Sequence, residues 1–184
     1  AADGMALKET RRSDTFIHYG IAATKMALDD AGLAIDDSNA ERVGVVVGSG
    51  IGGLPMIEEN IREMIAKGPR RISPFFVPGS IINMVAGLIS IQYGAKGPNV
   101  SMVSACTTSS HCVGEAGRMI EYGDADMMIA GGAEACVNMS GVGGFCSCKA
   151  LSTRNDDPKT ASRPFDKDRD GFVLGEGAGI LILE

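Results

Sequence analysis

The sequence has little of what several classes of protein require. Among its 184 residues there are no tryptophan, two histidines and five cysteines. An odd number of cysteines without a regular framework argues against a secreted disulfide scaffold. No apolar run reaches the roughly 18 residues of a membrane-spanning helix, and no basic segment with an apolar core marks a signal peptide. We therefore expect a cytoplasmic protein that does not enter the membrane.

The sequence also argues against nucleic acid and metal ions as ligands. The net charge of −6 argues against nucleic acid as a bulk partner. The run DKDRDGFVLGEG from Asp166 begins like a calcium-binding loop, but its glutamate, Glu176, comes one position too early and Pro164 interrupts the entering helix. Cys146 and Cys148 lack the four-ligand set of a zinc site. We expect no bound metal.

What the chain does have is glycine and apolar sequence in alternation. It contains 25 glycines and 45% hydrophobic residues, enough to form the core of one domain. The predicted helices cover residues 13–32 (capped by Ser13), 55–67, 80–93 and 107–122, and the predicted strands cover 42–48, 98–105, 126–132 and 177–184. Residues 138–150 form a short helix or a loop. Alternating helices and strands predict an α/β fold whose largely parallel sheet is covered on both faces.

The glycine cluster GSGIGG, residues 48–53, follows a predicted strand and precedes a helix. It satisfies the spacing of a dinucleotide-binding turn. The acidic residue that binds ribose is expected roughly 20 residues later, where this chain reads PRRISPFF. We therefore interpret the cluster as a structural turn between strand and helix, without a nucleotide.

Cys106 is the candidate nucleophile. In VSMVSACTTSSHCVGEAG it stands between a predicted strand and a predicted helix, where unpaired amides and the helix dipole stabilise a thiolate or an oxyanion. The alternative is a buried cysteine in a turn of small residues. His111 lies about 140° around the helix and points away. His18 falls on a polar helix face, where we expect exposure, so no base for Cys106 is visible.

Long stretches of the sequence resemble the β-ketoacyl-acyl-carrier-protein synthases of type II, which elongate fatty acids. The stretches are GSGIGGLPMIEEN, ISPFFVPGSIINMVAG, VSACTTSSHCVGEAGRMIEYGDADMMIAGGAEACV and GVGGFCSCKALSTRNDDPKTASRPFDKDRDGFVLGEGAG. The resemblance implies the thiolase fold, with αβαβα layers, and a homodimer without a cofactor. It implies that residues 1–184 are an incomplete N-terminal domain without its first strand.

The resemblance also assigns roles. Cys106 matches the cysteine that takes the acyl chain as a thioester, which malonyl carrier protein attacks after decarboxylation to give a 3-oxoacyl product. Ile51 matches a wall of the acyl pocket, and Phe76 a residue that the partner subunit contributes to its far end. Asp170 matches a residue that supports the catalytic lysine, and the charges of this run would form a buried ionic network. The alternative, above all for Asp166 and Asp168, is a solvated loop whose acids only cap and turn. The two catalytic histidines, the lysine and a second oxyanion-hole amide belong to the other half.

An acidic carrier protein needs a basic docking surface on this acidic enzyme. The residues that match such a surface are Lys8, Arg11, Arg12, Arg70, Arg71 and Lys149. Two other readings stay open: a polyketide ketosynthase or other thiolase-like acyltransferase, and a binding module in which the cysteine is inert. The STRNDDPKTASRPFDKDRDGF stretch favours the fatty-acid type. Residues 1–184 alone are expected neither to elongate acyl chains nor to form a stable monomer.

Overall fold

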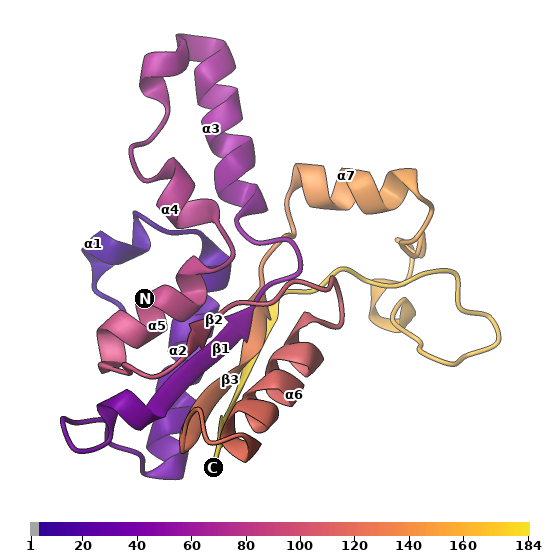
Figure 1. Ribbon diagram of the computed structural model, residues 1–184. Coiled ribbons are helices and arrows are strands. Elements are labelled where there is room, and N and C mark those ends of the chain that lie inside the picture. Colours follow the sequence, from indigo (N-terminus) through magenta and orange to yellow (C-terminus); the bar gives the residue numbers. More distant parts are fainter. Residues whose placement is uncertain (1–3) are drawn as a thin grey trace.

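The computed structural model describes residues 4–184 and contains one mixed sheet of four strands (Figure 1). The strands are β1 (Val43–Gly48), β2 (Asn99–Val100), β3 (Met127–Glu134) and β4 (Gly177–Leu183), in the order β2-β1-β3-β4. β1 pairs in parallel with both β2 and β3, whereas β4 runs antiparallel to β3. The predicted α/β class with a mostly parallel sheet is therefore confirmed.

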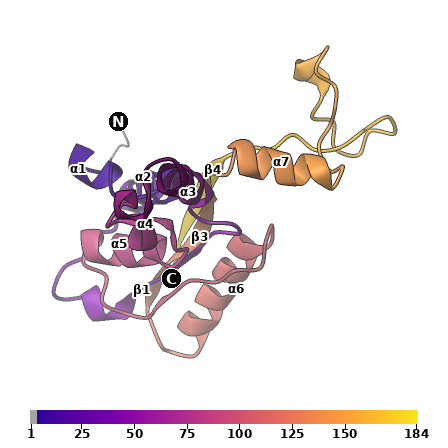
Figure 2. The ribbon, with the colours of Figure 1, turned by 90° about the horizontal axis from the view of Figure 1, so that it is seen from above.

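Helices cover both faces of the sheet. They are α1 (Leu7–Thr10), α2 (Thr15–Ala31), α3 (Leu54–Lys67), α4 (Phe76–Ser80), α5 (Met84–Tyr93), α6 (Thr108–Glu121) and α7 (Met139–Ser147), with 3-10 turns at Ala40–Arg42, Pro69–Arg71 and Pro158–Thr160. Figure 2 shows α2 and α5 on one side of the strands and α6 on the other. Within residues 4–184, no helix is long and apolar enough to cross a membrane.

The core follows from the alternation of side chains along β1. Val43, Val45 and Val47 point into the cluster formed with α2 and α5. Val46 points the other way, into the cluster formed with α6. Because successive side chains of a strand face opposite sides, a strand between two helical layers must be apolar at every position. This explains the uninterrupted VGVVVG run.

Two predicted elements are shorter in the structure. The predicted strand 98–105 keeps its ladder only at Asn99–Val100. Beyond that point the Ser101 hydroxyl donates to the Val47 carbonyl at 2.7 Å, and the chain leaves the sheet to turn at Ala105. The predicted helix 80–93 begins at Met84, because Ile81 is extended and separates α4 from α5. Residues 139–147, for which the sequence predicts either a short helix or a loop, form α7.

The start of α2 differs from the prediction. Asp14, and not Ser13, is the cap residue, since its side chain accepts from the Phe16 amide. The Ser13 hydroxyl instead donates to the Glu9 carbonyl and lies 3.1 Å from His18 Nε2. The predicted exposure of His18 is also wrong: the ring is half-buried by this contact, and burial lowers its pKa. A polar helix face covered by the preceding loop cannot be read from periodicity alone.

Asp14 joins three helical segments. One carboxylate oxygen accepts from the Phe16 amide at 3.4 Å and the other from the Met56 amide at 2.7 Å, in the first turn of α3. Its own amide donates to the Gly79 carbonyl at the end of α4. The residue before α3 is Gly53, which has no side chain to cap the helix. Asp14 is thus the cap of α2 and a distant cap of α3.

We expect Asp14→Ala to destabilise the protein more than Asp14→Asn does. Alanine leaves two helix amides without an acceptor, which costs about 1–3 kcal/mol. Asparagine keeps one acceptor oxygen and carries no charge, and burial already raises the Asp14 pKa by penalising the ionised form. Denaturant unfolding of the three proteins measures the difference. Equal losses for both variants would contradict a capping role.

Candidate active site

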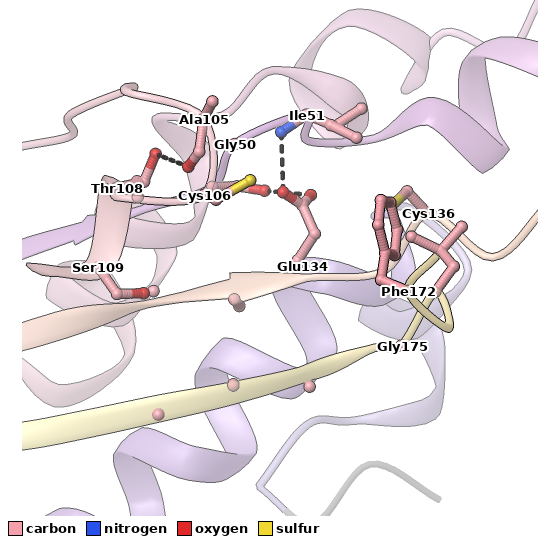
Figure 3. A pocket seen from close by; sticks show the side chains of 18 of the residues that line it. Gly50, Ile51, Ala105, Cys106, Thr108, Ser109, Glu134, Cys136, Phe172 and Gly175 are labelled. Atoms are coloured by element: carbon pink, nitrogen blue, oxygen red, sulfur yellow. Dashed lines mark hydrogen bonds between the residues drawn. The ribbon is translucent and has the colours of Figure 1, made fainter. Parts of the chain in front are cut away.

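A cavity of about 490 Å³ lies at the carboxyl ends of β1 and β3. Its wall comes from five parts of the chain: the turn after β1, the turn before α6, the end of β3, α7, and the segment from Phe172 to Gly179. Parallel strands end at the same edge of a sheet, which is where α/β proteins form their sites. The lining is mainly glycine, alanine and apolar side chains, with Cys106 and Glu134 among the few reactive groups (Figure 3).

Cys106 occupies a tight turn directly before α6. Ala105 adopts φ 53°, a left-handed conformation that is uncommon for a residue with a side chain. Thr108 fixes the turn, because its hydroxyl donates to the Ala105 carbonyl at 2.7 Å and accepts from the Ser104 amide at 2.9 Å. Cys106 is exposed and lines the cavity. The alternative of a buried cysteine is therefore wrong for this residue.

The glycine turn packs directly against this cysteine turn. A side chain at Gly48 would place its Cβ 2.2 Å from the Met102 carbonyl oxygen, and one at Gly50 would place it 3.0 Å from the Ala105 carbonyl oxygen. Contacts this short leave no room for a methyl group. The glycines of GSGIGG therefore allow two backbone segments to approach each other, as expected for a structural turn.

Glu134 was not singled out from the sequence, although it belongs to the site. It ends β3, and its carboxylate accepts from the Ser49 hydroxyl at 2.8 Å, the Ile51 amide at 3.0 Å and the Gly52 amide at 3.2 Å. Figure 3 shows it reaching from the strand to the glycine turn beside Cys106. The available signal was an acidic residue ending a buried apolar strand, in AGGAE.

The histidines do not serve Cys106. His111 Nδ1 lies 2.6 Å from the Ser104 hydroxyl, and among residues 4–184 no histidine makes a hydrogen bond with the Cys106 thiol. This agrees with the predicted orientation of His111. Cys112 belongs to the buried face of α6, where burial raises its pKa, so it is not a redox partner at the surface.

The two residues predicted to line an acyl pocket lie apart. Ile51 lines the cavity together with Cys106, at the tip of the glycine turn. Phe76 begins α4 and is not among the cavity residues. A contribution of Phe76 to the pocket of a partner subunit stays a prediction.

The acidic run lies on the surface of the described structure. Asp166, Asp168 and Asp170 are exposed, and none of them forms an ion pair within residues 4–184. Asp170 accepts from the Ser152 hydroxyl at 2.7 Å and the Thr153 amide at 3.1 Å, and these bonds lower its pKa. Asp166 accepts from the Asp168 amide at 2.8 Å, so within the described residues these acids hold turns and join Asp170 to the Ser152 segment. A buried ionic network with the other half of the protein stays a prediction. Support of a lysine by Asp170 stays a prediction.

The residues predicted to bind a carrier protein fall into separate groups. Lys8, Arg11 and Arg12 lie in or just after α1, and Arg70 and Arg71 in the 3-10 turn after α3. Arg12 stacks on Phe75, with its guanidinium 4.7 Å from the ring centre, which ties α1 to the segment before α4. Lys149 follows α7, which lies on the opposite side of the molecule from α1 in Figures 1 and 2.

Comparison with known proteins gives a consistent result. The family described as beta-ketoacyl synthase, N-terminal domain, matches residues 1–184. The chain is 58% identical over 180 residues to 3-oxoacyl-[acyl-carrier-protein] synthase 2 of Vibrio cholerae, covering 98% of this chain and 44% of that protein. It is 52% identical over 180 residues to the chloroplastic 3-oxoacyl-[acyl-carrier-protein] synthase I of Arabidopsis thaliana, covering 96% of this chain and 38% of that protein. The chain thus spans less than half the length of these relatives.

Solved structures of ketosynthases have a closely similar fold. A beta-ketoacyl synthase from Burkholderia phymatum has a TM-score of 0.84 at 34% identity, covering all of this chain and 45% of that one. A ketosynthase bound to a hexaketide, in complex with its type II PKS acyl-carrier protein, has a TM-score of 0.86 at 32% identity. The match covers 92% of this chain and 43% of that one. At these identities the two proteins share sequence as well as fold with this chain.

We expect Gly50→Ala to be destabilising, because its Cβ would lie 2.8 Å from Glu134 Oε2 and 3.0 Å from the Ala105 carbonyl oxygen. Overpacking of this kind costs about 1–3 kcal/mol. The matched control is Gly117→Ala in α6, where a Cβ meets nothing within 4 Å. There the higher helix propensity of alanine should be neutral or stabilising by up to about 1 kcal/mol. Thermal unfolding compares them, and a neutral Gly50→Ala would contradict the close packing of the two turns.

Proposed function

This chain belongs to the β-ketoacyl synthase family, and on that basis we propose that it forms the acyl-accepting half of a condensing enzyme of fatty-acid biosynthesis. The observation that carries the proposal is an exposed thiol, Cys106, at the start of α6 in a mainly apolar cavity. A thiol at a helix N-terminus beside apolar walls suits attack on a fatty acyl thioester.

In the proposed reaction the Cys106 sulfur attacks the carbonyl carbon of an acyl thioester. The new C–S bond forms as the carrier-protein sulfur leaves, and that sulfur ends as a thiol with the proton lost from Cys106. Malonyl carrier protein then loses CO₂, and the electron pair released at its α-carbon attacks the acyl-enzyme carbonyl. A C–C bond forms, the Cys106 sulfur leaves, and the product is a 3-oxoacyl carrier protein.

The residues of the described chain suit the first step better than the second. Loading needs a nucleophile and donors for the carbonyl oxygen, which the amides at the start of α6 can provide. Decarboxylation needs donors that hold the malonyl thioester, and both histidines already contact serine hydroxyls, Ser13 for His18 and Ser104 for His111. We propose that two further histidines and a lysine outside residues 1–184 supply this step. No cofactor takes part.

The cavity supports an apolar substrate. Ile51, Phe145 and Phe172 line it, and the two aromatic rings meet edge to face with their centres 5.3 Å apart. Aromatic and aliphatic walls favour an acyl chain over a polar substrate. An apolar chain bound there would lie between the glycine turn and α7.

An acyl carrier protein is the proposed partner, and a second copy of the chain the proposed subunit. The exposed basic residues of the α1 and α3 regions support the first, because a carrier protein is acidic. Exposed Val100 and Val103, at 41% and 57%, support the second, since they lie at and just beyond the short edge strand β2. The five free cysteines fit the proposed cytoplasmic location.

Two alternatives are weaker. A polyketide ketosynthase shares this fold, but the relative with a bound hexaketide is 32% identical, against 58% for the Vibrio cholerae synthase. A binding module with an inert cysteine does not explain an exposed thiol that faces a cavity.

We expect iodoacetamide to label Cys106 faster than the buried Cys112 and Cys136 and the exposed Cys146 and Cys148. Reactivity follows access and the local stabilisation of the thiolate, and only Cys106 stands directly before a helix of 14 residues. Prior loading with an acyl thioester should protect Cys106 alone. Peptide mass spectrometry of the full-length protein measures both effects. Cys146 and Cys148 serve as exposed controls, and uniform labelling of all five thiols would refute the nucleophile assignment.

Reversing Arg70 and Arg71 to glutamate should slow acyl transfer from the carrier protein by about tenfold or more, and transfer from a small acyl thioester far less. Salt should reduce the difference, because exposed charges are screened beyond about 10 Å at 0.1 M. Kinetics with both substrates at two salt concentrations measure this effect. The matched control reverses Lys159 and Lys167, which are exposed and, like Arg70 and Arg71, form no ion pair within residues 4–184. Equal losses on both substrates would indicate a folding defect instead of lost docking.

A further inference from the structure

Glu134 joins two segments that are far apart in sequence. Its contact with the Ile51 amide connects residues 83 positions apart, and it is the carboxylate at the end of β3 that reaches the glycine turn (Figure 3). A hydrogen bond over this separation does not form the turn. It fixes where the turn lies relative to the sheet.

Three donors converge on this one carboxylate. Oε1 accepts from the Ser49 hydroxyl and the Gly52 amide, and Oε2 accepts from the Ile51 amide. The Ser49 oxygen also accepts from the Gly52 amide at 3.0 Å, and Ser49 is only 2% exposed. Hydrogen bonds to an ionised acceptor are stronger than those between neutral groups. Glu134 therefore accepts from the Ile51 amide and from a buried hydroxyl, and it shares the Gly52 amide with the Ser49 oxygen.

The turn held in this way carries one wall of the cavity and touches the cysteine turn. Ile51 stands at its tip and lines the cavity with Cys106. Gly50 is enclosed between Glu134 Oε2 and the Ala105 carbonyl, with room for a hydrogen but not for a methyl group. Any displacement of the turn therefore changes the spacing between the apolar wall and the thiol.

We propose that Glu134 is a positioning residue that sets acyl chain selectivity by holding Ile51 at a fixed distance from Cys106. The inference rests on the proposed function, because it takes the cavity to hold the acyl chain. Glu134 does not touch the reacting atoms in this role. A fixed Ile51 limits which chains the cavity accepts, and a loosened turn accepts short and long chains more equally.

Glu134→Gln tests the proposal with little change in shape. The amide group keeps one acceptor oxygen, but its NH₂ must face at least one of the three donors. Hydrogen exchange of the full-length protein should be faster at the Ile51 amide, and less so at the Gly52 amide, which keeps the Ser49 oxygen as an acceptor. Cys106 should discriminate less between octanoyl- and palmitoyl-carrier protein as acyl donors. The ratio of the two kcat/KM values for acylation should change by about fivefold or more. Glu121→Gln, exposed at the end of α6, is the matched control and should change neither result.

A second variant covers the case in which Glu134→Gln does not fold. Ser49→Ala removes one donor to the carboxylate and one acceptor of the Gly52 amide, and it keeps the carboxylate and its bond to Ile51. It should therefore shift the ratio in the same direction by a smaller factor. An unchanged ratio in a folded variant, or equal losses for both acyl chains, overturns the positioning role. Absence of any Cys106 acylation in the unmodified protein overturns the proposed function, and the selectivity role with it. The exchange rates still report whether Glu134 holds the turn.

Discussion

The parallel pairing of β1 with β3 is the constraint on which the site depends. Its register sets Gly48, the last residue of β1, opposite Gly132, and β3 continues two residues further to Glu134. From there its carboxylate reaches the turn that follows β1. A register shift of one residue would turn this side chain to the other face of the sheet. Six residue pairs, from Val43 with Met127 to Gly48 with Gly132, hold this register, and β1 is buried on both faces.

Carboxylates that accept from distant backbone amides recur in this structure. Asp14 accepts from α3, Glu134 from the glycine turn, and Glu58 from the Ser140 amide at the start of α7. Glu176 likewise accepts from the Val137 amide just before α7. In each case an acidic side chain satisfies amides that their own segment leaves without an acceptor. The acidic composition is thus partly structural: these charges connect segments that share few apolar contacts.

Local patterns predicted the fold and the nucleophile but not these connections. Valine-rich runs and helix periodicity identified β1, β3 and four helices, and the change from strand to helix located Cys106. Glu134 was missed because its partners are more than 80 residues away, and no local pattern encodes them. Serine and aspartate both suit the cap of α2, so the sequence does not decide between Ser13 and Asp14. It also does not show that Asp14 accepts from the Met56 amide, 42 residues away. The strand 98–105 was overpredicted because its β-propensity is overridden by the turn at Ala105.

The strained Ala105 couples the position of the nucleophile, Cys106, to that of the cavity wall at Ile51. A left-handed alanine costs about 1–3 kcal/mol and persists only where the surroundings require it. Here Thr108 holds its carbonyl from one side and Gly50 packs against it from the other. The same carbonyl therefore fixes the cysteine turn and limits how closely the glycine turn can approach. Because Glu134 pulls the glycine turn toward β3 while Ala105 blocks further approach, the distance between Ile51 and Cys106 is set from both sides.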